Sequence, residues 1–280
     1  MGERGAPMDL RTYLFEPLEG LLFVADITAS EPGVLAGIKL ALDRAAELGL
    51  FVLAHLSDGS SVEAGACVLK VRGTAEQIAR AEEELLGCLG KPSGVAAAAC
   101  RFATLAGGRA RVVCGAWKKA PSEFRSRLRE AVEIGGAHMR SEDEPFVYLD
   151  KNYVRMFGGI SEALGRACSI DGRVVAVQVR GEGGPIAQEA VLAAGAGAGV
   201  VMVDTGSVED LRQVVEALRR RSGDHGVRIA FAGGVTAERF EEAIEAGADI
   251  IDIGRAIIDA PLLDFRLDVQ ARDDERLCRN

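Results

Sequence analysis

From residue 109 onward, short runs of apolar residues alternate with longer stretches in which apolar residues recur every three or four positions. The short runs predict strands buried on both faces, as in a parallel sheet. The longer stretches predict amphipathic helices between them. Predicted strands cover residues 112–114, 146–149, 174–179, 200–203, 229–232 and 250–253, and predicted helices cover residues 123–132, 160–168, 185–194, 208–220 and 237–246.

This regular alternation of strands and helices, joined by glycine-rich loops, favours a parallel α/β barrel. A doubly wound sheet is the alternative. No G-x-G-x-x-G segment follows an early strand, which weakens that alternative.

The first hundred residues follow a different pattern of strand, helix, strand, strand and helix. The strands are predicted at 21–28, 51–56 and 67–71, and the first helix at 35–48. Thr74 and Gln77 form a capping box that opens a second helix running through Glu84. We therefore divide the chain into an N-terminal α+β sandwich domain (1–105), an α/β barrel domain (106–265) and a C-terminal tail (266–280).

The composition restricts the function. Hydrophobic residues make up 48% of the chain and aromatic residues only 5%, so the core must be aliphatic. The net charge of −9 argues against nucleic acid as a partner, because phosphate backbones are bound by clustered basic residues. Six cysteines without a C-x-x-C pair, and only three histidines, disfavour a structural zinc site. No signal peptide or long apolar span is evident, so we expect a cytoplasmic protein without membrane contact.

Two glycine turns near the end of the predicted barrel carry the strongest chemical signal. The segment 231–236 reads Phe-Ala-Gly-Gly-Val-Thr, and 249–255 reads Asp-Ile-Ile-Asp-Ile-Gly-Arg. Glycine turns after neighbouring barrel strands bind phosphate through backbone N–H groups and a helix N-terminus. We predict that Gly233, Gly234 and Gly254 bind a phosphate, with Arg255 adding charge.

Several segments, in order along the chain, resemble the quinolinate phosphoribosyltransferase family, whose members are also called nicotinate-nucleotide pyrophosphorylases (carboxylating). The matching segments are 33–37 (GVLAG), 93–96 (SGVA), 117–121 (WKKAP), 131–140 (AVEIGGAHMR), 203–205 (VDT), 231–236 (FAGGVT), 252–254 (DIG) and 260–264 (APLLD). The resemblance implies an α+β N-terminal domain, an incomplete α/β barrel and a homodimer. It also implies phosphoribosyl pyrophosphate as a substrate, with Mg²⁺ as a cofactor.

The same resemblance implies roles for individual residues. Lys118 matches a lysine that contacts phosphoribosyl pyrophosphate or the acid substrate. Arg140 matches an arginine that binds carboxylate or phosphate, and His138 lies one position from the family's histidine. Asp204 matches an aspartate that places magnesium or the ribose hydroxyls. We predict Lys118, Arg140 and Asp204 as catalytic residues, with Asp204 also the metal ligand.

Other positions depart from the family pattern. Glu83 replaces the arginine that reaches across the dimer to the quinolinate acid, and Trp117 replaces the arginine of the basic segment. Gln178 replaces a glutamate. Quinolinate is a dianion and needs cations around it. We therefore interpret Glu83 and Trp117 as an altered acceptor pocket, and we predict a nitrogen heterocycle other than quinolinate. Gln178 weakens the magnesium site, because that ion prefers carboxylate oxygens. His138 and Gln178 are also counted among the predicted substrate-binding residues.

Two alternatives stay open. One is a true quinolinate phosphoribosyltransferase of NAD biosynthesis. The other is a non-catalytic paralogue that binds a phosphorylated small molecule without turning it over.

Overall fold

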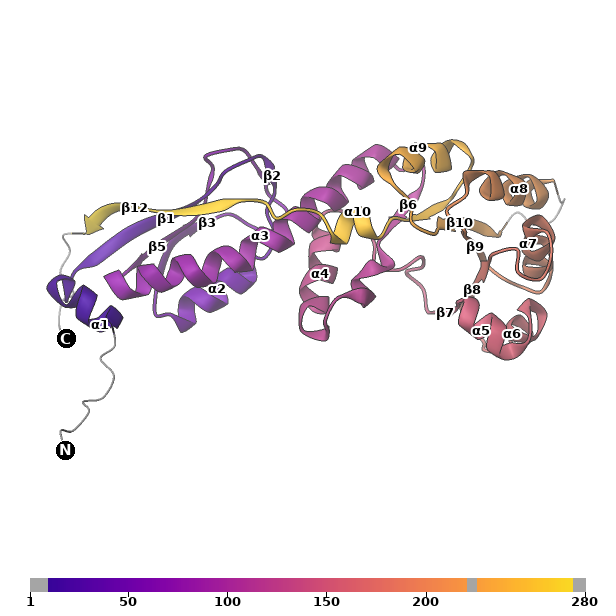
Figure 1. The fold of residues 1–280 in the computed structure, drawn as a ribbon, viewed down its shortest axis with the longest axis horizontal. Coiled ribbons are helices and arrows are strands. Elements are labelled where there is room, and N and C mark those ends of the chain that lie inside the picture. Colours follow the sequence, from indigo (N-terminus) through magenta and orange to yellow (C-terminus); the bar gives the residue numbers. More distant parts are fainter. Residues whose placement is uncertain (1–9, 221–225, 274–280) are drawn as a thin grey trace, which may run out of the picture. The chain divides into compact units, whose positions relative to one another are not determined.

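The computed structural model describes residues 10–220 and 226–273 and divides the chain into two compact units. The first unit comprises residues up to 97 together with residues from 261 onward, and the second comprises residues 98–260. The division falls within the long helix α3 (Ala75–Ala106). The elements of both units are labelled in Figure 1.

The first unit is built on an antiparallel sheet in the strand order β12-β1-β5-β3. One face of this sheet packs on α2 and the start of α3 through aliphatic residues such as Ile27, Leu69 and Leu85. The elements of this unit, besides α3, are α1 (Leu10–Phe15), the 3-10 helix η1 (Glu16–Leu18), β1 (Leu22–Ala29), β2 (Gly33–Val34), α2 (Ile38–Glu47), β3 (Phe51–His55), β4 (Ser61–Val62), β5 (Cys67–Gly73) and β12 (Phe265–Asp273).

The predicted capping box opens α3. The backbone N–H of Thr74 donates to Gln77 Oε1 at 2.9 Å, and the N–H of Gln77 donates to Thr74 Oγ1 at 3.3 Å. The helix continues far beyond Glu84, through Pro92, to Ala106.

The predicted C-terminal tail starts inside a strand. Residues 265–273 form β12, which pairs with the whole length of β1 from Ala29–Phe265 to Leu22–Asp273. The chain therefore returns from the second unit to the sheet of the first, so a tail from residue 266 does not describe this segment.

The second unit is a parallel sheet in the order β6-β11-β10-β9-β8-β7, which confirms the incomplete α/β barrel. Helices lie between successive strands, as labelled in Figure 1. Its elements are β6 (Arg111–Val113), η2 (Gly115–Lys119), α4 (Ser122–Ile134), β7 (Phe146–Leu149), α5 (Lys151–Phe157), α6 (Ile160–Ala167), β8 (Val174–Val179), α7 (Ile186–Gly195), β9 (Val200–Asp204), α8 (Val208–Arg219), β10 (Arg228–Ala232), α9 (Ala237–Glu245), β11 (Ile250–Asp252) and α10 (Arg255–Ile258).

The concave side of this sheet is filled by small and aliphatic side chains. Buried residues from five strands form one cluster, consisting of Val113, Ala176, Val200, Met202, Ala230, Ala232 and Ile250. Phe146, Tyr148 and Val174 pack against it. Because this interior is filled by side chains, we look for a ligand site at the ends of the strands.

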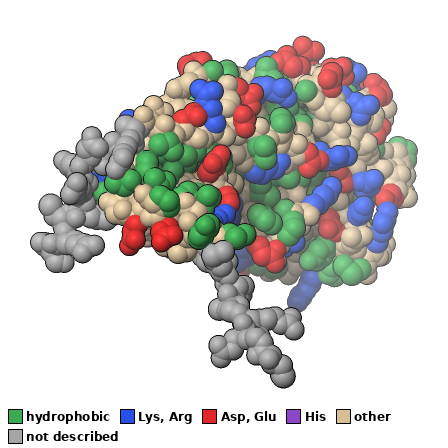
Figure 2. Space-filling view, turned by 60° about the vertical axis from the view of Figure 1, so that its left-hand side comes forward, with side chains coloured by type: hydrophobic (Ala, Val, Ile, Leu, Met, Phe, Trp, Pro, Cys, Tyr) green, Lys and Arg blue, Asp and Glu red, His purple; other side chains and the backbone are tan. Residues whose placement is uncertain are grey.

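The surface carries charges of both signs. On the face drawn in Figure 2, acidic and basic side chains are interspersed, with hydrophobic side chains between them. The large hydrophobic residues that are most exposed in the first unit include Phe51, Val52 and Leu53 on β3 and Leu10, Tyr13 and Leu14 on α1. In the part of the chain that the structure describes, no helix has the length and apolar character needed to cross a membrane.

Candidate functional site at the barrel mouth

The carboxyl ends of the parallel strands surround a cavity of about 360 Å³. It is lined by four cationic side chains, namely Lys118, Lys119, Lys151 and Arg255. Three carboxylates also line it, from Asp150, Asp204 and Asp252, together with the glycines 115, 233, 234 and 254. Catalytic groups of barrel enzymes gather at this end, so this cavity is the candidate site.

The predicted phosphate turns lie together in this cavity. Ala232 is in register with Asp204, so the turn that begins at Gly233 lies beside the end of β9. Gly233 and Gly234 have φ angles of 101° and 80°, which glycine adopts without steric cost. The turn leads into α9, whose first residues follow the cap Thr236. The free N–H groups of this helix end and of the turn suit an anion.

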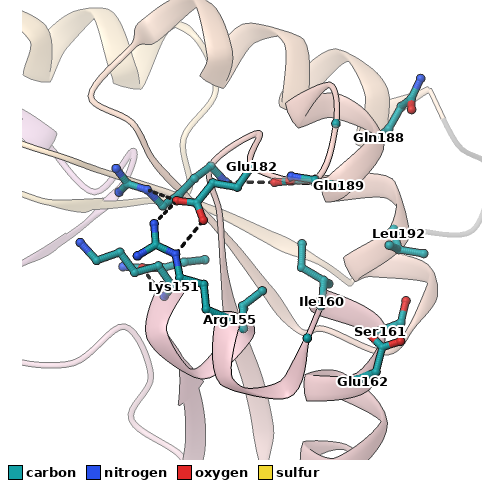
Figure 3. A pocket seen from close by; sticks show the side chains of 16 residues that line it. Lys151, Arg155, Ile160, Ser161, Glu162, Glu182, Gln188, Glu189 and Leu192 are labelled. Atoms are coloured by element: carbon teal, nitrogen blue, oxygen red, sulfur yellow. Dashed lines mark hydrogen bonds and ion pairs between the residues drawn. The ribbon is translucent and has the colours of Figure 1, made fainter.

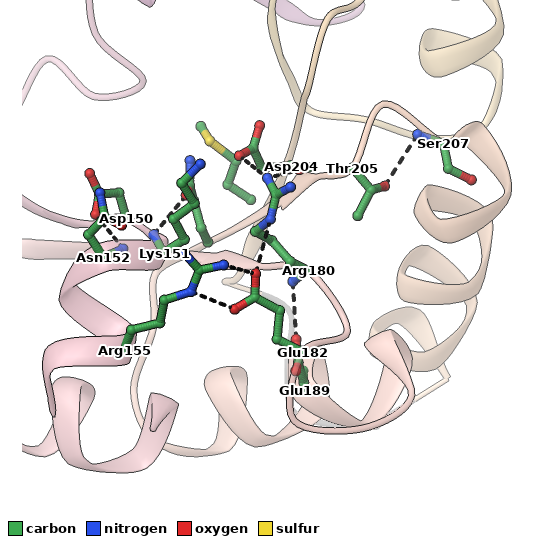
Figure 4. A network of polar contacts seen from close by, with 12 residues as sticks. Asp150, Lys151, Asn152, Arg155, Arg180, Glu182, Glu189, Asp204, Thr205 and Ser207 are labelled. Atoms are coloured by element: carbon green, nitrogen blue, oxygen red, sulfur yellow. Dashed lines mark hydrogen bonds and ion pairs between the residues drawn. The ribbon is translucent and has the colours of Figure 1, made fainter. Parts of the chain in front are cut away.

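Asp204 ends β9 and is bound by an arginine that the sequence analysis did not single out. Arg180 Nη1 lies 2.6 Å from Asp204 Oδ2, and the same nitrogen donates to the main-chain oxygen of Asp204. Figure 4 shows the Arg180 guanidinium between Asp204 and Glu182. Arg180 Nε lies 3.5 Å from Glu182 Oε1, and Arg155 binds both Glu182 oxygens at 2.6 and 2.9 Å. The predicted catalytic aspartate thus ends a four-residue chain of ion pairs.

Both polar atoms of the Gln178 amide form hydrogen bonds on the inner wall. Its Oε1 accepts from the backbone N–H of Lys151 at 2.9 Å, and its Nε2 donates to Tyr148 Oη at 2.6 Å. Asp150 Oδ1 accepts from the N–H groups of Asn152 and Tyr153 and so caps α5. These bonds fix the start of α5, and Lys151 at that start borders the cavity.

Asp252 ends β11 opposite the lysines of η2. Its Oδ1 accepts from the N–H of Gly115 at 2.9 Å. Burial is the main cause that raises the pKa of the Asp252 carboxyl, and the hydrogen bond from Gly115 and the charge of Lys118 oppose that rise. Burial likewise raises the pKa of the Tyr148 hydroxyl above its ordinary value, with Asp252 and Asp204 adding to the effect. Both groups are therefore held toward their neutral forms at the mouth.

Four of the predicted site residues do not line this cavity. The Trp117 ring lies beneath the Arg129 guanidinium, with Arg129 Cζ 4.8 Å from the ring centroid. His138 pairs with β6 through its backbone, and burial lowers the pKa of its imidazole. Arg140 is exposed, and its main-chain oxygen accepts from Arg111 Nε at 3.2 Å. Glu83 lies on α3 in the first unit, exposed and paired with Arg11. Their roles as substrate contacts stay predictions.

Other residues at the mouth were missed by sequence reasoning. Lys119 lies beside Lys118, to which the resemblance did point, and Lys151 follows soon after the end of β7. Asp252 could have been found from its place at the end of a strand. Arg180 likewise follows directly after the predicted strand 174–179, so its place at a strand end was the available signal.

A second and larger cavity, of about 520 Å³, lies between α5, α6 and the start of α7. Figure 3 shows Lys151, Arg155 and Glu182 on one of its sides and Ile160, Leu192 and Glu162 on another. Its most buried carboxylate, Glu189, accepts from the backbone N–H groups of Arg180, Gly181 and Gly183 and so clamps the loop after β8. The charges that line this larger cavity are largely paired with one another. The smaller mouth cavity is therefore the better candidate for binding an anion.

The predicted magnesium site does not fit these residues well. Asp204 is paired with Arg180, Gln178 is an amide with both polar atoms bonded, and Asp252 is held toward its neutral form. Magnesium prefers several carboxylate and water oxygens in octahedral geometry. Over residues 10–220 and 226–273, no group of three or more His, Cys, Asp or Glu side chains is placed to hold a metal ion.

Fold and site together define an incomplete α/β barrel with cationic side chains and glycine turns at its mouth. Comparison with known proteins then identifies its family. The family model described as the N-terminal domain of quinolinate phosphoribosyl transferase matches residues 12–93, and the model of the C-terminal domain matches residues 95–268. The chain belongs to the quinolinate phosphoribosyltransferase family, which confirms the resemblance seen in the sequence.

Curated relatives support this membership over nearly the full length. A protein of Archaeoglobus fulgidus, named probable nicotinate-nucleotide pyrophosphorylase (carboxylating), is 32% identical over 251 residues, which cover 88% of this chain and 93% of that protein. The nicotinate-nucleotide pyrophosphorylase (carboxylating) of Rattus norvegicus is 30% identical over 276 residues, which cover 94% of this chain and 90% of that protein. These relatives are pentosyltransferases, and the chain is a member of that class of enzyme.

A solved structure shows the same fold. The nicotinate-nucleotide pyrophosphorylase of Francisella tularensis superposes with a TM-score of 0.79 at 24% identity, covering 95% of this chain and 91% of that one.

Proposed function

We propose that this protein transfers the phosphoribosyl group of phosphoribosyl pyrophosphate to quinolinate at the barrel mouth. The observation that carries the proposal is the set of four cationic side chains, from Lys118, Lys119, Lys151 and Arg255, around one cavity with the glycine turns. Cations paired with backbone N–H groups suit a ligand with phosphate at one end and carboxylates at the other.

This proposal replaces the prediction of a different heterocycle. That prediction assumed that Glu83 and Trp117 had removed the positive charge of the acceptor pocket. The structure instead brings Lys119 and Lys151 to the mouth, where they supply charge that the resemblance did not assign. Glu83 lies in the first unit and forms an ion pair with Arg11. The relatives from Archaeoglobus fulgidus and Rattus norvegicus are also named as carboxylating enzymes.

The chemistry follows from these charges. The pyridine nitrogen of quinolinate attacks the anomeric carbon, a carbon–nitrogen bond forms, and the bond to pyrophosphate breaks. The carboxylate beside the nitrogen then leaves as carbon dioxide, and the ring carbon that carried it keeps the electron pair and takes up a proton. The lysines stabilise the negative charge that develops on the departing pyrophosphate. Asp204 lies at the end of β9, where it can orient the ribose hydroxyls.

A second candidate is transfer to a neutral or cationic heterocycle. It is favoured by the three carboxylates of Asp150, Asp204 and Asp252 at the same mouth. An assay of phosphoribosyl pyrophosphate turnover separates the two candidates. It compares the rate with quinolinate with the rates for a panel of uncharged pyridine and other nitrogen bases. A Glu83→Arg variant with clearly tighter quinolinate binding would favour the second candidate.

We also propose that the protein acts as a homodimer in the cytoplasm. The exposed residues Phe51, Val52 and Leu53 on β3, at 50%, 38% and 47% exposure, provide an apolar surface that a second copy could cover. Sedimentation of the purified protein tests the dimer, and a monomer at micromolar concentration would rule it out.

A further inference from the structure

The resemblance predicts Asp204 as a metal ligand, but the Asp204 carboxylate already forms an ion pair with Arg180. Arg180 Nη1 lies 2.6 Å from Asp204 Oδ2 and also contacts the main-chain oxygen of Asp204. Both side chains are largely shielded from solvent, with 32% of Arg180 and 19% of Asp204 exposed. Asp204 lines the mouth cavity and Arg180 lines the larger cavity beside it, so the pair lies between the two, where solvent screens it only in part.

The position of Arg180 is fixed by its surroundings. Its backbone N–H donates to Glu189 Oε2 at 3.1 Å, and Glu189 also accepts from Gly181 and Gly183. On the other side its guanidinium faces Glu182, which is held by Arg155 (Figure 4). The guanidinium is therefore placed before any ligand arrives, and its remaining N–H groups are not engaged by Asp204.

The neighbouring groups cannot easily make up a metal site around Asp204. Gln178 gives its amide oxygen to the Lys151 N–H. Asp252 is engaged by the Gly115 N–H, and burial favours its neutral form. A divalent ion at Asp204 would also lie close to a guanidinium that stays charged at every accessible pH, and like charges repel most strongly in a partly buried site.

We propose that Arg180 takes the place of a protein-held divalent cation, so that the Arg180–Asp204 pair, and not a metal ion, meets the pyrophosphate of the substrate. This inference rests on the proposed function. Because Nη1 donates to Asp204 and Nε faces Glu182, the Nη2 group is left to donate to phosphate oxygens, and the guanidinium adds a permanent positive charge. The Asp204 carboxylate holds the guanidinium and remains free on Oδ1 to accept from a ribose hydroxyl.

The first test measures metal binding by the full chain without substrate, with Mn²⁺ followed by electron paramagnetic resonance. The wild type should bind Mn²⁺ at least about tenfold more weakly than Arg180→Gln, because the variant frees the Asp204 carboxylate. The double variant Arg180→Gln/Asp204→Asn should lose that gain. Arg155→Gln is the matched control, because it removes an arginine from the same network and leaves the Arg180–Asp204 pair intact, so it should behave as the wild type.

The second test measures binding of phosphoribosyl pyrophosphate by calorimetry, with a chelator and with excess Mg²⁺. The affinity of the wild type for phosphoribosyl pyrophosphate should differ by less than about threefold between the two conditions. Arg180→Gln should bind at least about tenfold more weakly in the chelator and recover when Mg²⁺ is added. Thermal unfolding of each variant shows whether it is folded, and Arg180→Lys provides a second variant that keeps the charge.

The outcomes separate the two proposals. Equal Mn²⁺ affinity of the wild type and Arg180→Gln would overturn the inference, as would wild-type binding that collapses in the chelator. Failure of the wild type to bind phosphoribosyl pyrophosphate under both conditions would contradict the proposed function. The Mn²⁺ comparison would still decide whether Arg180 occupies the metal position.

Discussion

Gly206 and Gly233 touch where the loops after β9 and β10 meet. A β-carbon on Gly233 would lie 2.4 Å from the amide nitrogen of Gly206, and one on Gly206 would lie 2.2 Å from the carbonyl oxygen of Gly233. Gly206 also donates its N–H to the carbonyl of Ala232 at 3.0 Å. This contact joins the loop that follows Asp204 to the predicted phosphate turn through backbone atoms, and Arg239 Nη1 also donates to the Gly206 carbonyl at 2.9 Å.

The contact predicts different costs for two neighbouring substitutions. Gly233→Ala meets backbone atoms and a positive φ, so it should lower the free energy of unfolding by about 2–3 kcal/mol. Gly234→Ala also has a positive φ, but no atom lies within 4 Å of its added carbon, so it should cost only about 1 kcal/mol. Urea denaturation of both variants measures the difference. Equal costs would show that the loops do not touch in this way.

The hydrogen bond between Gln178 and Tyr148 can be tested by removing one hydroxyl. Tyr148→Phe leaves the partly buried Gln178 Nε2 without its acceptor, and should cost about 1–2 kcal/mol of unfolding free energy. Tyr153→Phe removes the same atom from a side chain that is 47% exposed, and should change stability by less than about 0.5 kcal/mol. Similar values for the two variants would contradict the network described for the inner wall.

Lys118 should contribute to substrate affinity more than to stability. Lys118→Gln removes one of the cations at the mouth and should weaken binding of phosphoribosyl pyrophosphate about tenfold, with little change in unfolding free energy. Calorimetry measures the affinity. Lys39→Gln, on an exposed position of α2, is the matched control and should bind as the wild type does. An unchanged affinity in Lys118→Gln would remove Lys118 from the site.

The raised pKa of Asp252 gives a pH dependence of known sign. An acid whose pKa is higher in the folded than in the unfolded state stabilises the fold below its unfolded pKa. That contribution is lost as the pH rises through the folded pKa. Asp252→Asn keeps an oxygen for the Gly115 N–H and cannot ionise. The wild type should therefore lose stability relative to Asp252→Asn as the pH rises from acid toward neutral, and parallel stability profiles would contradict this account.

The sequence predicted the second unit well because its strands are short apolar runs that end in glycine turns. Those runs are β6 to β11, with no boundary shifted by more than one residue. The last strand, β12, was missed, although Phe265, Leu267 and Val269 alternate with polar residues there as an antiparallel strand requires. Its partner β1 lies more than 230 positions away, so no local pattern could show the pairing.

The site was only partly predictable for a related reason. The glycine turns, Lys118 and Asp204 lie at strand ends, where motif and position agree. The Arg180–Asp204 pair joins the ends of two neighbouring strands, and only their parallel register brings it together. We expected a loss of positive charge because of the substitutions at Glu83 and Trp117. That expectation did not include the charges of Lys119 and Lys151, which also line the mouth.

The most direct test of the proposed function is a single turnover assay with the purified full chain, phosphoribosyl pyrophosphate and quinolinate. The proposal predicts equal amounts of nicotinate mononucleotide, pyrophosphate and carbon dioxide, with a rate that falls at least about tenfold in Lys118→Gln. Absence of nicotinate mononucleotide, from a protein that binds phosphoribosyl pyrophosphate and is folded, would contradict it.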